Sequence, residues 1–76
     1  MTKGQTAAAE FIESFLESED TSFDYNDLTN CVEESKARVK NWMSIRQVLA
    51  YFINEDYIAR DRSDLSIERF YKKNNS

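Results

Sequence analysis

The stretch IRQVLAYFINEDYIAR, residues 45–60, decides the fold. Its apolar residues recur at three- and four-residue intervals, which is the period of one helix face. With the tryptophan just before the stretch, this face comprises Trp42, Ile45, Val48, Leu49 and Phe52. Because such a face has to be buried, we expect a helix over about residues 41–54. Asn54, Glu55 and Asp56 are expected to end it, since Asn and Asp adopt the left-handed backbone conformation more readily than other non-glycine residues.

Two more helices are expected before this one. An apolar face at helical spacing predicts the first over about residues 6–18, with Thr6 as its N-cap. That face comprises Ala8, Phe11, Ile12, Phe15 and Leu16. Asp24, followed three residues later by Asp27, has the spacing of a helix-capping pair. A second helix is therefore expected over about residues 25–36, with a buried side made of Leu28, Cys31 and Val32.

Residues 57–71 fit two structures. Apolar and polar residues partly alternate on both sides of Ser63 and Asp64, which predicts a β-hairpin. Ile67, Phe70 and Tyr71 also have helical spacing, so a fourth helix, giving an all-α four-helix bundle, is the alternative. The expected class is mostly α with a small β-hairpin. A chain of 76 residues cannot bury a second core, so we expect one domain over residues 1–76, with 72–76 as a frayed tail.

Charge is divided unevenly along the chain. The formal net charge is −4, but nine of the 14 acidic residues lie in residues 1–35 and nine of the ten basic residues lie in residues 36–76. Residues 36–46 carry four positive charges and no negative one. Charges act locally, over a Debye length of about 8–10 Å, so this patch can attract phosphate despite the net charge. The alternative is a solvated basic face that is attracted to the acidic half.

The residues that most enzymes and metal sites use are missing. The chain has no histidine and a single cysteine, and it contains no glycine-rich phosphate loop and no nucleophile motif. We therefore expect no catalytic residue, no metal and no cofactor. Cys31 is expected to be an unreactive helix-face residue in a reducing compartment. No secretory signal is apparent and no apolar run approaches the ~20 residues of a membrane span, so a cytoplasmic protein is expected.

The order of three helices and a hairpin, together with residues 45–60, resembles the winged helix-turn-helix superfamily over about residues 25–71. In that superfamily the third helix often runs into a Gly-apolar-Ile step, where this chain has Asp56-Tyr57-Ile58. The resemblance implies a third helix in the major groove of DNA, with the hairpin as a wing beside it. It implies Arg46 and Gln47 as base-reading residues and the other cations as phosphate contacts. The implied DNA-binding residues are Lys36, Arg38, Lys40, Asn41, Ser44, Arg46, Gln47, Arg60, Arg62 and Arg69.

We thus expect a small regulatory or accessory protein that binds double-stranded DNA. A homodimer is expected because one small module gives limited affinity alone. The alternative is a protein-binding adaptor or inhibitor of the kind that phages and plasmids encode. Its acidic first helix, through Glu10, Glu13 and Glu17, would bind a basic surface of a host protein and imitate DNA. A structural oligomerisation domain is the third hypothesis.

Overall fold

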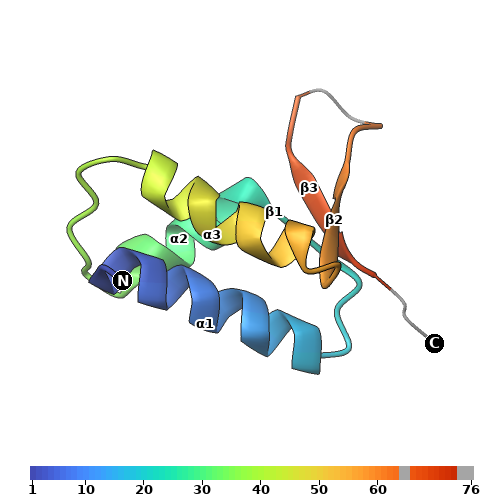
Figure 1. Cartoon of the computed structure of the whole chain (residues 1–76), viewed down its shortest axis with the longest axis horizontal. Helices are drawn as coiled ribbons and strands as arrows, with labels where there is room; N and C mark the ends of the chain where they lie inside the picture. Colours follow the sequence, from blue (N-terminus) through green and yellow to red (C-terminus); the bar gives the residue numbers. More distant parts are fainter. Residues whose placement is uncertain (64–65, 74–76) are drawn as a thin grey trace.

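The computed structural model describes residues 1–63 and 66–73, which form three helices and one small antiparallel sheet of three strands (Figure 1). The elements in chain order are α1 (Lys3–Glu17), β1 (Ser22–Asp24), α2 (Tyr25–Glu34), α3 (Met43–Asn54), β2 (Ile58–Asp61) and β3 (Arg69–Lys72). The expected class, mostly α with a β-hairpin, is confirmed. The all-α alternative is wrong, because β2 and β3 pair as antiparallel strands.

Helix α1 begins three residues before the predicted start. Thr2 is its N-cap: the Thr2 hydroxyl accepts a hydrogen bond from the Gln5 backbone N–H at 3.1 Å, and the Gln5 side chain accepts one from the Thr2 backbone N–H at 3.0 Å. This reciprocal pair satisfies two backbone donors at once, which explains why it prevails over Thr6. The prediction of Thr6 as N-cap is wrong, and its hydroxyl donates to the Thr2 carbonyl inside the helix.

The predicted capping pair of α2 is confirmed. The Asp24 carboxylate accepts from the Asp27 backbone N–H at 2.8 Å, and the Asp27 carboxylate accepts from the Asp24 backbone N–H at 3.0 Å. The helix ends two residues earlier than predicted, since Lys36 adopts the left-handed conformation with φ of 62°. Helix α3 starts two residues later than predicted. Asn41 instead forms a turn, in which its side-chain oxygen accepts a hydrogen bond from the Met43 backbone N–H.

Asp56 confirms the expected end of α3, with φ of 65°. The chain then forms the hairpin of β2 and β3, in which Arg60 lies opposite Phe70. Asp64, expected in the hairpin turn, lies outside the described residues, as do positions 74–76 of the expected tail. Residue 72 belongs to β3, and the Lys73 N–H donates to the Tyr57 carbonyl at 3.1 Å, so these two residues are not frayed as predicted.

Strand β1 was not predicted. It follows α1 and pairs with β3, which gives the sheet the order β1-β3-β2. Phe23 lies opposite Phe70, and their rings are stacked with centroids 5.3 Å apart. Phe23 also makes edge-on contacts with Phe11 and Phe15 of α1, at 5.2 and 4.8 Å between ring centroids. These aromatic contacts join the sheet to the helices.

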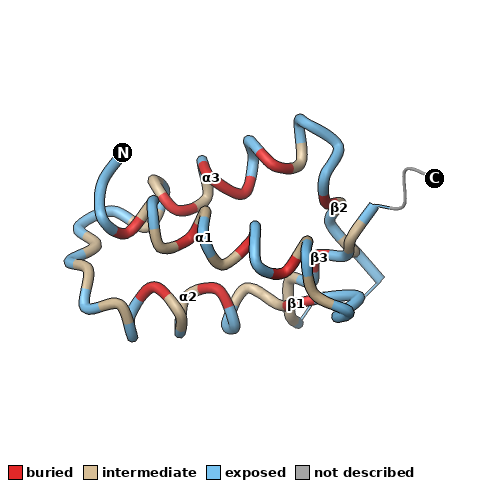
Figure 2. Tube along the Cα trace, turned by 90° about the horizontal axis from the view of Figure 1, so that it is seen from below, coloured by how far each residue is buried: buried red, intermediate tan, exposed pale blue. Residues whose placement is uncertain are grey.

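The core is formed by one face of each helix and the inner residues of the sheet (Figure 2). α1 packs against both α2 and α3, which lie on either side of it (Figure 2). Phe11, Leu16 and Trp42, expected on buried helix faces, are only partly buried at its margin. Cys31, expected on the buried side of α2, is also only half-buried. The buried apolar residues are Ala8, Ile12, Phe15, Phe23, Leu28, Val32, Ile45, Val48, Leu49, Phe52, Ile58 and Phe70.

Candidate nucleic-acid interface

Exposed cations lie at both ends of α3. The loop before the helix alternates between inward and outward residues: Ala37 and Val39 pack against the core, whereas Lys36, Arg38 and Lys40 are exposed. This alternation is the side-chain pattern of an extended backbone. The hairpin at the other end of α3 projects beyond the helices (Figure 1). It carries the exposed residues Arg60, Arg62 and Arg69. The fold therefore brings the predicted cations to two places, one at each end of the helix.

The outer face of α3 between these two groups carries one charged side chain, that of the half-buried Arg46. Met43, Gln47, Ala50 and Asn54 are exposed and recur at helical spacing. Met43 is the most exposed large apolar residue of α3, at 59%. Gln47, one of the two predicted base-reading residues, thus lies on a surface that a ligand can reach.

Two other predicted residues at the entrance of α3 have structural contacts. The Asn41 side-chain oxygen accepts from the Met43 backbone N–H at 2.9 Å, and the Asn41 backbone carbonyl accepts from the Ser44 hydroxyl at 2.9 Å. Ser44 is half-buried, and its carbonyl accepts a hydrogen bond from the Gln5 side chain at 3.2 Å. Both residues therefore stabilise the start of α3 and its contact with α1.

Arg46, the other predicted base-reading residue, is held by contacts within the chain. Its two terminal nitrogens donate to the two carboxylate oxygens of Glu68 at 3.2 and 2.7 Å. Its guanidinium lies over the ring of Tyr25, 4.3 Å from the centroid. The hydrogen bond from Arg46 lowers the pKa of the Glu68 carboxyl, against the opposing effect of burial, and the same bond raises the pKa of Arg46. Glu68 is therefore ionised at neutral pH.

Glu68 also approaches Arg60, whose Nε is 3.7 Å from the second carboxylate oxygen. The backbone carbonyl of Glu68 accepts a hydrogen bond from the Tyr25 N–H at 2.9 Å. We call Tyr25, Arg46, Arg60 and Glu68 the Glu68 cluster. It joins the start of α2, the first turn of α3 and the hairpin. The sequence analysis did not identify Glu68 or Tyr25, because nothing in the local spacing places either one beside Arg46.

The remaining basic residues of the hairpin differ in their surroundings. Arg69 lies in register between Asp24 and Asp61 on the neighbouring strands, so two acidic residues flank it. Lys72 donates from Nζ to the Ser18 carbonyl at 2.6 Å, which satisfies the end of α1. Lys73 pairs with Asp56 at 3.1 Å. Arg62 remains exposed, and no ion pair to it is found among the described residues.

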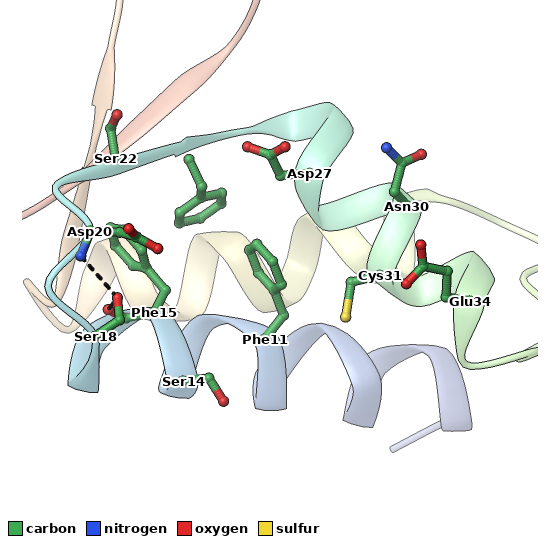
Figure 3. A pocket seen from close by; sticks show the side chains of 11 residues that line it. Phe11, Ser14, Phe15, Ser18, Asp20, Ser22, Asp27, Asn30, Cys31 and Glu34 are labelled. Atoms are coloured by element: carbon green, nitrogen blue, oxygen red, sulfur yellow. Dashed lines mark hydrogen bonds between the residues drawn. The ribbon is translucent and has the colours of Figure 1, made fainter.

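The acidic residues lie in two places: Glu13 and Glu17 of α1 lie beside Tyr51 of α3, whereas others surround a groove between α1 and α2. α1, β1 and α2 surround an open groove of about 600 Å³ (Figure 3). Aromatic side chains and Cys31 line it together with Asp20, Asp27 and Glu34. Burial raises the pKa of the Cys31 thiol, and the negative charges of Glu34 and Glu10 raise it further. The raised pKa favours the protonated thiol, which is the less nucleophilic form, and the expectation that Cys31 is unreactive stays a prediction.

Comparison with protein-family models, curated proteins and solved structures gave no match. In the part of the chain that the structure describes, no group of three or more acidic or cysteine side chains is arranged to hold a metal ion. Within residues 1–63 and 66–73, no helix has the length and apolar character needed to cross a membrane.

Proposed function

We propose that this chain is a DNA-binding module in which α3 enters the major groove and the hairpin contacts the backbone beside it. The observation that carries the proposal is the placement of exposed cations at both ends of an exposed helix face, on which the one charged side chain, Arg46, is paired with Glu68. The topology supports it, because three helices followed by a hairpin, with a short third strand paired to β3, are compatible with a winged-helix arrangement.

The dimensions of α3 suit this role. A helix of 12 residues is about 18 Å long, and the major groove, about 12 Å wide, admits one helix between its two phosphate backbones. Cations at both ends of such a helix lie where the backbones pass. The loop residues Lys36, Arg38 and Lys40 would contact one backbone, and Arg62 the other.

The exposed face of α3 has the chemistry to contact bases. The Gln47 amide can pair with adenine through two hydrogen bonds, while Ala50 and Met43 offer apolar contact to a thymine methyl group. These side chains favour sites that contain A·T pairs. The hydrogen bonds to adenine and the apolar contacts to thymine involve no charge. The cations therefore supply the attraction to DNA, and α3 supplies the discrimination between sequences.

The test is a fluorescence-anisotropy titration of a labelled mixed-sequence duplex at low salt. Arg38→Gln and Arg62→Gln each remove one cation from the proposed interface. Ser14→Glu is the matched control, because it changes the net charge by the same amount on the exposed side of α1 that borders the acidic groove. Each arginine variant is expected to lose about tenfold in affinity at 50 mM salt, and the control much less. Absence of binding by the unsubstituted protein would refute the proposal.

A second function is favoured by the groove between α1, β1 and α2. Its aromatic floor and acidic rim suit a basic segment of a partner protein that carries an apolar anchor. Under this alternative the protein is an adaptor or inhibitor. Substituting Asp20→Lys together with Glu34→Lys would abolish binding of such a partner, whereas Arg38→Gln would leave it unchanged. Light scattering of the free protein and of the DNA complex tests whether the expected homodimer forms.

A further inference from the structure

Glu68 is an acidic side chain at a place where the proposed interface should attract phosphate. It lies beside Arg46 of α3 and Arg60 of β2, with 36% of its side chain exposed. An acidic group at that place costs binding energy with any DNA sequence, since it repels the backbone. We propose that Glu68 is a positioning residue, which lowers the total affinity for DNA but raises sequence selectivity by fixing Arg46 and the hairpin relative to α3. This inference rests on the proposed DNA-binding function.

The contacts of Arg46 fix both the plane and the direction of its guanidinium. The paired hydrogen bonds to Glu68 hold one edge of the group, and the Tyr25 ring lies against its face. A guanidinium has five N–H donors in a rigid plane, and two of them bind Glu68. Nε–H and one N–H on each terminal nitrogen are therefore not used by Glu68. Arg46 can keep its contact with Glu68 while it donates to a base, with little rotamer freedom left to lose.

The same carboxylate also sets the direction of the hairpin. Glu68 directly precedes β3, its side chain lies 3.7 Å from Arg60 on β2, and its backbone carbonyl is bound by Tyr25 at the start of α2. Glu68 lies on the loop side of the paired strands, next to the Asp61–Arg69 pair, so its contacts with α2 and α3 constrain where the projecting part of the hairpin points (Figure 1). A wing held in one direction can contact the backbone only in one register relative to α3, which adds to selectivity.

The charge of the cluster predicts what happens when Glu68 is neutralised. Two guanidinium groups share one carboxylate, so the group carries one net positive charge. Glu68→Gln raises the net charge of the cluster to two positive charges and frees both arginines to contact phosphate. Non-specific affinity should therefore rise, while the orientation of Arg46 and of the hairpin is lost. A rise in affinity together with a fall in selectivity distinguishes positioning from two other roles. If Glu68 only repelled the backbone, Glu68→Gln would tighten binding of every duplex by the same factor. If its role were purely structural, Glu68→Gln would weaken binding of every duplex.

The experiment first selects the preferred duplex from a random library with the unsubstituted protein. Dissociation constants are then measured at 100 mM salt for the selected duplex and for a scrambled duplex of the same composition. For Glu68→Gln we expect about tenfold tighter binding of the scrambled duplex and at least a fivefold fall in the ratio of the two affinities. Glu33→Gln is the matched control, because it removes the same charge from an exposed position on α2. It should leave the ratio unchanged.

Two further measurements keep the inference testable if Glu68→Gln is poorly folded. Arg46→Gln should lower the ratio without tightening the scrambled complex, and the Arg46 Nε–H resonance of the free, unsubstituted protein should show restricted guanidinium rotation. Three results would overturn the role of Glu68 and leave the proposed function standing. They are an unchanged ratio of affinities in both variants, equal tightening of both complexes, and free rotation of the Arg46 guanidinium. Failure of the unsubstituted protein to bind or to prefer any duplex overturns the proposed function together with this inference.

Discussion

The dependence of DNA binding on salt follows from the number of cations that the interface presents. Lys36, Arg38, Lys40 and Arg62 are exposed, and within the described residues no ion pair is found for any of them. Each phosphate that a cation neutralises releases counterions and contributes about −0.9 to the slope of log K against log salt concentration. Four contacts give a slope of about −3.6, so raising salt from 50 to 200 mM should weaken binding by about 150-fold.

This slope can be measured by anisotropy on one labelled duplex at three salt concentrations. Arg62→Gln should reduce the slope to about −2.7, because one phosphate contact is lost, whereas Ser14→Glu should leave it unchanged. The acidic groove should matter little: the molecule measures 36 × 26 × 21 Å, so charges on opposite faces lie about two Debye lengths apart at 0.1 M salt. A slope shallower than about −2, or the same slope in Arg62→Gln, would refute the assignment of these cations to phosphate contacts.

Three predictions concern the folded state and are checked by urea unfolding followed by circular dichroism. Asp24→Ala removes the capping pair of α2 and should lower the free energy of unfolding by about 1 kcal/mol; an unchanged midpoint would contradict the capping role. A Cβ on Gly4 would meet a methyl of Val39 at 3.0 Å. Gly4→Ala should leave the free energy of unfolding nearly unchanged, because the gain in helix propensity of about 1 kcal/mol offsets this crowding. Gly4→Val should lower the free energy of unfolding. Since Arg46 lowers the pKa of Glu68, their pair stabilises the fold above the ordinary carboxyl pKa and loses this effect as pH falls through the lowered value. The extra stability at pH 7 relative to acid should be smaller in Glu68→Gln, and an identical pH profile would exclude the contribution.

The helices and the hairpin could be predicted because their signals are local. Residues 45–60 contain both the apolar period of α3 and the Asp56 that ends it, and Asp24 and Asp27 lie within one helical turn of each other. β1 could not be predicted in this way. It has three residues with one buried side chain, Phe23, which is too short to show alternation, and its partner strand lies far away in the sequence.

In the candidate site too, the sequence predicted what depends on nearby residues and did not predict contacts between residues distant in the chain. The helical period places Gln47 on the outer face of α3, and the structure agrees. The same period places Arg46 outside the core, but it carries no information about what lies beside it. The partner, Glu68, is 22 residues away and reaches Arg46 only because β3 pairs with β1, next to the start of α2. Sequence periodicity can therefore say that a side chain is exposed, but not whether it is free.

The two proposed functions use different surfaces of one small domain. The cations lie in the loop before α3 and in the hairpin, while the acidic groove is formed by α1, β1 and α2 (Figure 3). A duplex bound at α3 would therefore leave the groove accessible, and a protein bound in the groove would leave α3 accessible. Substitutions at distant, unconnected sites have additive effects. If Arg38→Gln weakens only DNA binding and Glu34→Lys weakens only protein binding, one chain can bind both partners at once, and the uneven charge along the sequence has a function in each half.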